Sequence, residues 1–382
     1  MKKFLLSLLF LLLLCLTACD PLIKPEPLVP VADDPKPITV TLNAVGDNLI
    51  HYPIYEYAYD MGKDHYDFSS CYAPIAALLG AADITFLNQE ITTAGEEYGI
   101  SSYPMFNSPK ELAYEMAALG VDVVNQASNH SLDSGLAALI ETLDLWHSLG
   151  VKTVGVYQEE TDSNIQIIER NGLSFAFLGY DYGLNGFSLD DWQGYKIAML
   201  DDETTMFAEV DQAKTMADFV IVSLHWGNEG DLKGNDAQRE LAQKLADHNV
   251  DLILGHHPHV IQPVDLLLRA DGKTMPVFYS LGNLISNQID AENMLGGMAQ
   301  VTFVKDGDGT SVQSPVLIPL VTHFETQFWA TRVYLLQDYT TALAARHGIL
   351  GYDSRFSCDY LQALYESVVS EEFRPAAEEI TK

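Results

Sequence analysis

The sequence predicts an α/β fold in which two sheets pack together and helices cover their outer faces. Two observations support this prediction: short β-branched runs alternate with helical stretches from residue 38 onward, and later segments have the pattern of antiparallel hairpins. Apolar runs of four to six residues between helices are typical of buried, largely parallel strands. Hydrophobic residues make up 48% of the 382 residues, which is ample for a packed core.

The expected elements follow one another along the chain. The strands are expected at residues 38–45, 83–87, 121–124, 218–224 and 250–254. Helices are expected at 108–119, where residues 108–111 match a capping box, at 133–149 and at 236–248. Hairpins are expected at 165–180, 264–279 and 298–320, because each contains an Asn-Gly or Asp-Gly turn. Residues 337–382 predict a helical tail with acidic clusters.

The first 18 residues predict an export signal of the lipoprotein type. Lys2 and Lys3 precede an apolar run, and small residues lead to Cys19 in a pattern that resembles the bacterial lipobox. We therefore expect acyl chains on Cys19 to anchor the protein to the cell membrane on its extracytoplasmic face. The alternative is an ordinary cleaved signal that happens to contain a cysteine. Residues 19–37 contain six prolines and predict a stiff tether.

The charge of the chain argues against a nucleic-acid partner. The sequence has 53 acidic and 21 basic residues, a formal charge of −32, whereas binding to phosphates needs a basic surface. Its four cysteines are too few for a disulfide scaffold or a thiolate metal cluster. Cys71 and Cys358 could pair in an oxidising compartment, but we favour two unpaired thiols.

The histidines carry the main functional prediction. Six of the eleven lie just after predicted strands: His51, His130, His225, His256, His257 and His259. Oxygen ligands accompany them: Asp47, Asn88, Glu90, Asn129 and Asp133. Because the loops beyond the carboxyl ends of strands meet at one edge of a sheet, we expect these side chains to converge. Imidazole and oxygen donors without cysteine predict a site for Mn, Fe or Zn.

Each of these segments, taken alone, also has a structural explanation. Asp47 and His51 could be a helix cap and a surface histidine, and Asn129 with Asp133 could begin a helix. The strongest single segment is GHHPH at 255–259, since three imidazoles in four residues are a poor structural choice and a good ligand block. The sequence leaves open whether His256 or His257 is the ligand.

Six blocks in fixed order resemble a known family. GDNLIH, NQE, SNHSLD, HWGNE, GHHPH and YSLGN, spread over residues 38–287, look like the CapA family of poly-γ-glutamate capsule biosynthesis proteins. That family is similar to the calcineurin-like metallophosphoesterases. The resemblance implies a four-layer α/β/β/α sandwich of the metallo-dependent phosphatase type, which strands in 288–336 would complete. It also implies two divalent metal ions between the sheets.

The resemblance further implies a role for each site residue. Asp47 would bridge the two ions, with His51 and Glu90 on one, Asn129 and His225 on the other, His257 and His259 completing the ligands, and His130 protonating the leaving oxygen. The sequence departs from the phosphoesterase pattern in the spacing of Asp47 and His51, which are four residues apart instead of two. The acid that normally follows the Asn-His pair is replaced, if at all, by Asp133.

Two functions are consistent with this resemblance. The first is a metal-dependent hydrolase that cleaves a phosphoester or an amide bond at the cell surface. The second is a non-catalytic component that exports or anchors the anionic capsule polymer beside capsule synthase subunits in the membrane. An acidic surface repels a polyanion unless bound cations bridge the two, which favours the first function.

Overall fold

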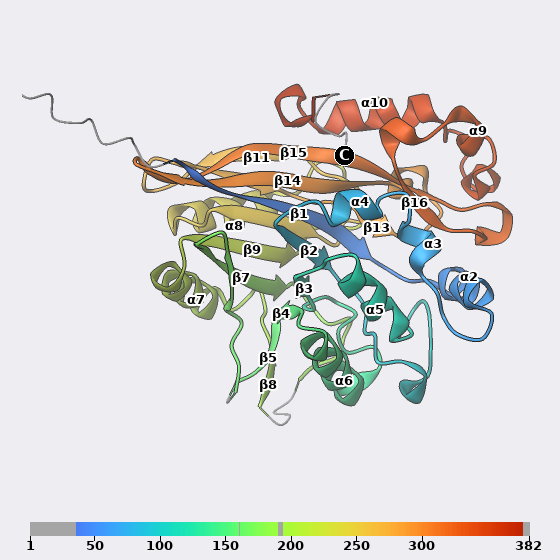
Figure 1. Cartoon of the computed structure of the whole chain (residues 1–382), viewed down its shortest axis with the longest axis horizontal. Coiled ribbons are helices and arrows are strands. Elements are labelled where there is room, and N and C mark those ends of the chain that lie inside the picture. The colour runs from blue at the N-terminus through green and yellow to red at the C-terminus, as the bar shows by residue number, and fades with distance from the viewer. Residues whose placement is uncertain (1–35, 160, 190–193, 377–382) are drawn as a thin grey trace, which may run out of the picture. The chain divides into compact units, whose positions relative to one another are not determined.

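The computed structural model describes residues 36–159, 161–189 and 194–376, and Pro37–Lys382 forms one compact unit. The predicted export signal, the lipidation residue Cys19 and nearly all of the tether lie outside the described residues. Two facing sheets with helices on their outer faces make up the unit, so the predicted four-layer arrangement is confirmed (Figure 1).

The first sheet has eight strands in the order β16-β15-β14-β1-β2-β3-β4, with β13 pairing beside β1. Strands β1 to β4 run parallel, whereas β14, β15 and β16 are antiparallel to their neighbours. The strands are β1 (Ile38–Asn48), β2 (Ile84–Asn88), β3 (Val123–Asn125), β4 (Lys152–Val154), β13 (Asn283–Ile285), β14 (Leu295–Asp306), β15 (Gly309–His323) and β16 (Arg332–Leu335).

The second sheet has six strands in the order β11-β12-β10-β9-β7-β6. They are β6 (Gln166–Arg170), β7 (Leu173–Asp181), β9 (Phe219–His225), β10 (Leu252–His256), β11 (Val264–Leu268) and β12 (Thr274–Phe278). Strands β7, β9, β10 and β12 are parallel, and the hairpins β6–β7 and β11–β12 close the two edges. A separate pair joins β5 (Val156–Gln158) to β8 (Tyr195–Ile197).

Helices cover both outer faces. The first sheet packs against α2 (Tyr52–Gly62), α3 (Ser69–Tyr72), α4 (Ala76–Leu79), α5 (Glu111–Ala118) and α6 (Gly135–Ser148). The second sheet packs against α7 (Glu203–Met216) and α8 (Asp236–Asp247). In the tail, α9 (Thr341–Ala344) and α10 (Cys358–Val368) contribute to the core cluster that also contains residues of β14 and β15. The 3₁₀ turns are η1 (Glu96–Tyr98), η2 (Ala291–Met294), η3 (Thr326–Phe328), η4 (Leu336–Asp338), η5 (Gly348–Gly351) and η6 (Glu371–Phe373).

Period-two alternation decides which side chains face the space between the sheets. In β1, Leu42 and Ala44 belong to the central core with Phe86 of β2, while Val45 belongs to the outer cluster beneath the helices. The second sheet alternates in the same way, with Phe177 and Ile221 inward. The central core therefore fixes which side chains at the carboxyl ends of the strands face the space between the sheets.

The predicted strands and the three hairpins are confirmed, but the predicted capping box is wrong. Helix α5 begins at Glu111 without a side-chain cap, and the Ser108 hydroxyl is buried without a partner. The reason is that the Ser108 backbone bonds to the 92–95 segment, through its N–H to Thr92 and its carbonyl to Gly95. A capping box does occur at α8, where Asn235 and Gln238 bond reciprocally, and it was not predicted.

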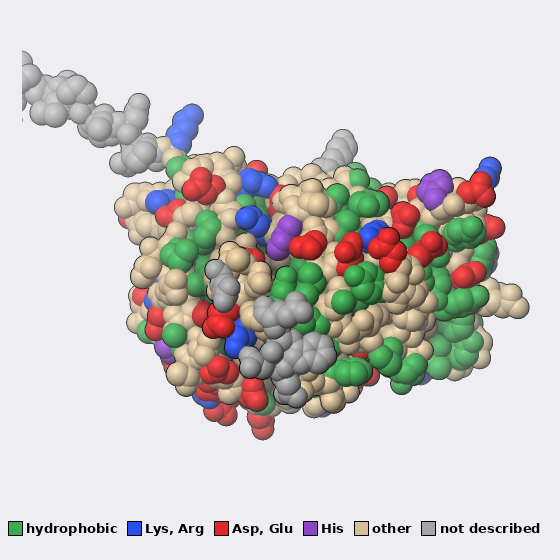
Figure 2. Space-filling view, turned by 90° about the horizontal axis from the view of Figure 1, so that it is seen from below, with side chains coloured by type: hydrophobic (Ala, Val, Ile, Leu, Met, Phe, Trp, Pro, Cys, Tyr) green, Lys and Arg blue, Asp and Glu red, His purple; other side chains and the backbone are tan. Residues whose placement is uncertain are grey.

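The remaining observations concern the two cysteines, the surface charge and the length of the helices. Cys71 is buried, Cys358 is half-buried, and both are free thiols. Figure 2 shows acidic side chains scattered over one face with few basic ones among them. Within the described part of the chain, no helix has both the length and the apolar character needed to cross a membrane.

Candidate metal centre

Two rows of polar residues face each other at the carboxyl ends of the two sheets. On the first sheet, Asp47, Asn88 and Asn125 are paired in register across β1, β2 and β3. On the second sheet, Asp181, His225 and His256 are paired in register across β7, β9 and β10. Both rows continue the inward-facing alternation of the core residues below them, so the side chains meet between the sheets.

A β-bulge at Gly46 gives Asp47 its direction. Val45 pairs with Leu87 and Asp47 with Asn88, so β1 has one residue more than β2 at this point. In regular alternation after Ala44, which faces inward, and Val45, which faces outward, Gly46 would face inward and Asp47 outward. The bulge at Gly46 shifts this phase by one residue, so Asp47 faces inward. Only glycine fits here, because a Cβ on Gly46 would lie 1.9 Å from the Gly282 carbonyl oxygen.

Asp47 is held firmly once it faces inward. The Asn88 amide donates to its Oδ1 at 2.8 Å, and the His259 Nδ1 lies 2.9 Å from its Oδ2. Asn88 is held in turn by Asn125, whose amide donates to the Asn88 side-chain oxygen at 2.8 Å. This chain of buried amides fixes the orientation of the carboxylate before any ligand binds.

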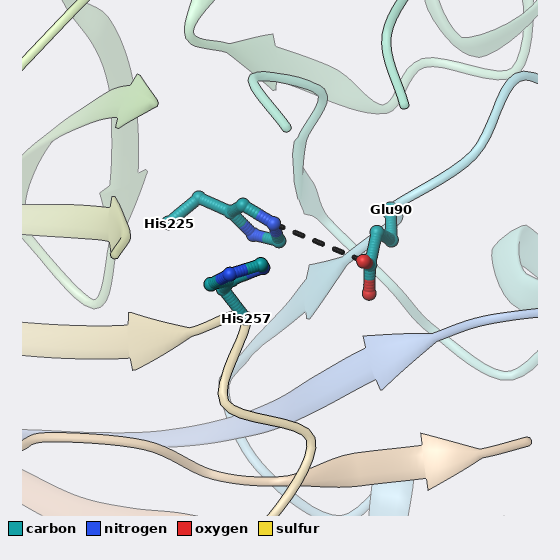
Figure 3. Close-up of side chains that lie close together, drawn as sticks. All are labelled: Glu90, His225 and His257. Atoms are coloured by element: carbon teal, nitrogen blue, oxygen red, sulfur yellow. Dashed lines mark ion pairs between the residues drawn. The ribbon is translucent and has the colours of Figure 1, made fainter. Parts of the chain in front are cut away.

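Three sets of side chains have ligand atoms within 4.8 Å of one another. The sets are Asp47 with Glu90 and His259, Glu90 with His225 and His257, and Glu229 with His257 and His259. Figure 3 shows His225 and His257 directed toward Glu90 from the second sheet and its following loop. The Glu90 Oε1 lies 3.8 Å from the His225 Nε2 and 3.6 Å from the His259 Nε2. Glu90 is therefore the member shared by the two buried sets.

Orphaned polar atoms show that this set of donors fits divalent cations. Glu90 is fully buried, and neither of its carboxylate oxygens has a hydrogen-bond partner. The His257 Nδ1 is also buried and without a partner. Burying unpartnered groups of this kind costs several kcal/mol, roughly, unless a cation satisfies them. Mixed carboxylate and imidazole donors suit Mn, Fe or Zn.

The pKa shifts agree with this interpretation. Burial lowers the pKa of His225 well below its usual value and that of His257 to about 3, so both imidazoles are neutral and able to bind a metal. Burial raises the pKa of Glu90 well above its usual value. Burial opposes charge on His259 too, but Glu90 and Asp47 outweigh it and raise its pKa to about 9. In the metal-free protein, a protonated His259 thus balances the Asp47 carboxylate, while the raised pKa of Glu90 favours its neutral form.

The Asn129–Asp133 segment brings three further predicted residues to the centre or beside it. The Asn129 side-chain oxygen lies 2.9 Å from the His225 Nε2. The His130 Nδ1 lies 2.7 Å from the Asp133 Oδ2, which also accepts the backbone N–H of Phe106 at 2.7 Å. The His130 ring packs edge-on against Phe106, with ring centroids 4.9 Å apart. His130 is therefore held in a fixed orientation by Asp133 and Phe106.

Two predicted histidine ligands fall outside the three sets. The His51 Nδ1 lies 3.1 Å from the Leu49 carbonyl oxygen and 3.2 Å from the Asn287 backbone nitrogen. The His256 ring stacks on Phe86, and its Nδ1 remains 3.8 Å from the Asp47 Oδ1. Of the two histidines that the sequence left open, the geometry thus favours His257 as a ligand.

Three residues of the centre were not predicted from the sequence. Glu229, the last residue of HWGNE, is exposed and completes the third set. Asp181 ends β7 beside His225, and burial raises its pKa well above its usual value. The Tyr182 ring lies against His257, at 4.5 Å between ring centroids, and against His225 at 6.2 Å. Glu229 had a sequence signal, four residues after His225, whereas Asp181 and Tyr182 are identified only by the strand register.

Two curated capsule proteins are similar to this chain. The chain is 30% identical over 210 residues to the PGA biosynthesis protein CapA of Bacillus subtilis, covering 54% of this chain and 53% of that protein. It is 31% identical over 188 residues to the capsule biosynthesis protein CapA of Bacillus anthracis, covering 48% of this chain and 44% of that protein. The chain thus spans about half the length of these curated relatives.

Solved structures give more distant similarities. One is a 5′-nucleotidase precursor of Thermus thermophilus, at a TM-score of 0.47 and 14% identity over 86% of this chain and 59% of that one. Another is the NAD nucleotidase of Haemophilus influenzae, at a TM-score of 0.47 and 13% identity; the match covers 89% of this chain and 65% of that one. The family model described as bacterial capsule synthesis protein PGA_cap matches residues 41–288, well over half of the chain. The chain therefore belongs to the PGA_cap family of bacterial capsule synthesis proteins.

Proposed function

We propose that this chain is a lipid-anchored, metal-dependent hydrolase of capsule polymer synthesis, acting on the extracytoplasmic face of the cell membrane. The observation that carries the proposal is the position of Glu90, a buried and unpartnered carboxylate shared by two sets of metal-ligand side chains. A carboxylate shared in this way is what a pair of neighbouring cations requires.

The geometry supports a specific distribution of ligands. Asp47, Glu90 and His259 would hold one cation, and Glu90, Asn129, His225 and His257 the other. Glu90 would then be the bridging ligand, in place of Asp47. Glu229 would approach from the exposed side, through the set that it forms with His257 and His259.

Bound cations would polarise the scissile phosphoryl or acyl group and lower the pKa of the attacking water. The chain itself would supply the proton for the leaving group. In the imidazolium form of His130, Asp133 would accept the Nδ1 hydrogen and Nε2 would carry the proton to be transferred. When water adds to phosphorus or carbon and the P–O or C–N bond breaks, this proton would pass to the departing oxygen or nitrogen, and the proton that the attacking water releases to solvent would restore the imidazolium. Tyr182 excludes water from one side of the histidines.

The charges of the centre support a substrate with low negative charge. The ion pairs made by its carboxylates within the described residues are with histidine alone. Two divalent cations would thus be largely neutralised by Asp47, Glu90, Asp181 and Glu229. A phosphodiester or a γ-glutamyl amide suits such a site better than a doubly charged phosphomonoester.

The experiment uses the full chain, purified in detergent. Metal content is measured after loading with Mn²⁺, Fe²⁺ or Zn²⁺, and turnover is measured with a phosphodiester and a γ-glutamyl amide. We expect about two ions per chain and turnover that His130→Ala abolishes without loss of metal. A metal-loaded protein that turns over neither substrate would contradict the hydrolase. Release of the protein from membranes by Cys19→Ser would support the lipid anchor.

Family membership favours one second candidate, a non-catalytic component that guides the polymer to capsule synthase subunits. The two Bacillus relatives are named for polymer or capsule biosynthesis and not for hydrolysis. This candidate requires cations to join an acidic protein to a polyanion. Poly-γ-glutamate binding that depends on divalent cations, in a protein without turnover, would favour it over the hydrolase.

A further inference from the structure

Asp181 is a buried carboxylate without a role in the ligand sets. It is the last residue of β7, is fully buried, and neither of its oxygens has a hydrogen-bond partner. The carboxylate lies near the backbone N–H groups of Tyr182 and Gly183 without forming a regular hydrogen bond to them. Such a group is costly to retain unless it has a partner in the working protein.

A matching donor lies on the next strand. Asp181 pairs in register with His225, so both side chains project from the same face of neighbouring strands, which are about 4.8 Å apart. The His225 Nε2 faces Asn129 and Glu90, whereas its Nδ1 is buried and has no partner. The residue with the unpaired acceptor and the residue with the unpaired donor are therefore in-register neighbours on the same face of the sheet.

We infer that Asp181 is a positioning residue that accepts the Nδ1 hydrogen of His225 and directs its Nε2 toward the metal. The inference rests on the proposed metal centre. Histidines that bind metals commonly donate their second ring N–H to a carboxylate, which fixes the tautomer and raises the basicity of the ligand nitrogen. The other in-register neighbour of His225 is His256, which approaches Asp47 and is a weaker acceptor than a carboxylate.

The test compares two substitutions of Asp181 in the full chain. Asp181→Asn keeps an oxygen that can accept the hydrogen bond, and Asp181→Ala removes it. The matched control is Ser223→Ala, because Ser223 lies on the same face of β9, two residues before His225, and its hydroxyl is also buried without a partner. Affinities for Zn²⁺ and Mn²⁺ are measured by chelator competition, and the melting temperature of each metal-free protein is recorded.

We expect Asp181→Ala to lose about 10- to 100-fold in metal affinity, Asp181→Asn to lose less, and Ser223→Ala to equal the wild type. Metal-free Asp181→Asn should melt at or above the wild-type temperature, since it loses a buried unpartnered carboxylate. In ¹⁵N-histidine NMR spectra, the Zn²⁺-loaded wild type should show a downfield imidazole N–H signal that Asp181→Ala lacks.

Three outcomes would overturn the inference. If both Asp181 variants bind metal as tightly as the wild type, Asp181 does not position His225. If affinity falls only in step with the melting temperature of the metal-free protein, the role of Asp181 is structural. If the wild type itself binds neither Zn²⁺ nor Mn²⁺, the proposed metal centre fails, and the inference fails with it.

Discussion

Replacing Glu90 by glutamine tests the centre most directly, because this residue belongs to both buried ligand sets. Glutamine has nearly the same volume, so the packing between the sheets is retained while the charge is lost. The change should affect the metal-bound and metal-free proteins in opposite directions. Both effects follow from the burial of a carboxylate whose two oxygens have no partner.

The magnitudes can be estimated from the burial of Glu90. Removing one charged partner from a buried charge pair costs about 3–5 kcal/mol, which for metal binding is roughly 10²–10⁴-fold in affinity. Because both sets share Glu90, we expect the number of bound ions to fall from two to one or none. In the metal-free protein the raised pKa of Glu90 means that this carboxyl group destabilises the fold at neutral pH, so its replacement by glutamine should raise the free energy of unfolding by up to about 3 kcal/mol.

The assay combines metal analysis, after dialysis against metal buffered by a chelator, with urea unfolding of the metal-free protein. Glu209→Gln is the control, since Glu209 is part-buried and bonded to Tyr180 and Asn164, away from the ligand sets. It should leave metal content unchanged. The reasoning is refuted if Glu90→Gln retains two ions at wild-type affinity, or if its metal-free form is less stable than that of Glu209→Gln.

Three further predictions concern other parts of the unit. Asp133→Asn should lower kcat by about 10²-fold or more without loss of metal, because it removes the charged partner of His130; equal loss of metal content would contradict this. Gly46→Ala should destabilise the fold by about 1–3 kcal/mol in urea unfolding and lower the metal content, since its Cβ would meet the Gly282 carbonyl. A free energy of unfolding and a metal content equal to those of the wild type would show that the bulge does not require glycine. His347 accepts the Ile349 N–H, and burial lowers its pKa to about 4, below the unfolded value of about 6.5. The stability that the neutral imidazole of His347 gives to the folded state, on the order of 3 kcal/mol, is therefore fully present above pH 6.5 and is lost as the pH falls toward 4. His347→Gln should flatten the pH dependence of unfolding over this range relative to the exposed His65→Gln, and an unchanged slope would contradict the assignment.

The sequence predicted the strands well because their signal is local. An apolar run bounded by polar residues, as at 218–224, is sufficient to place β9. Helix α7 was missed because its signal is weak: only Met206, Val210 and Ala213 of its 14 residues are buried. A helix with so narrow an apolar stripe is fixed by the sheet on which it packs, which local periodicity does not describe.

The structure brings most of the predicted site residues together, but the way they group could not be read from the sequence. Asp47 was expected to bridge the ions from its similarity to a family motif, whereas we propose Glu90 for that role because it is common to the two buried sets. The grouping depends on the register of β1 with β2, including the bulge at Gly46, which the spacing of the motifs does not show. The choice between His256 and His257 depended likewise on where β10 ends, since His256 is still part of the strand.

Aromatic packing explains how so many unpartnered groups can be held at one place. Directly below the row of Asp47, Asn88 and Asn125 lies the row of Ala44, Phe86 and Val123, and Phe86 stacks on Phe177 of the opposite sheet at 6.0 Å between ring centroids. Because the phase of each strand is fixed by these buried side chains, the residues at the strand ends must face inward even when their polar groups are unsatisfied. The cost of the metal-free site is therefore offset by the core beneath it, and bound cations would add stability without changing the fold.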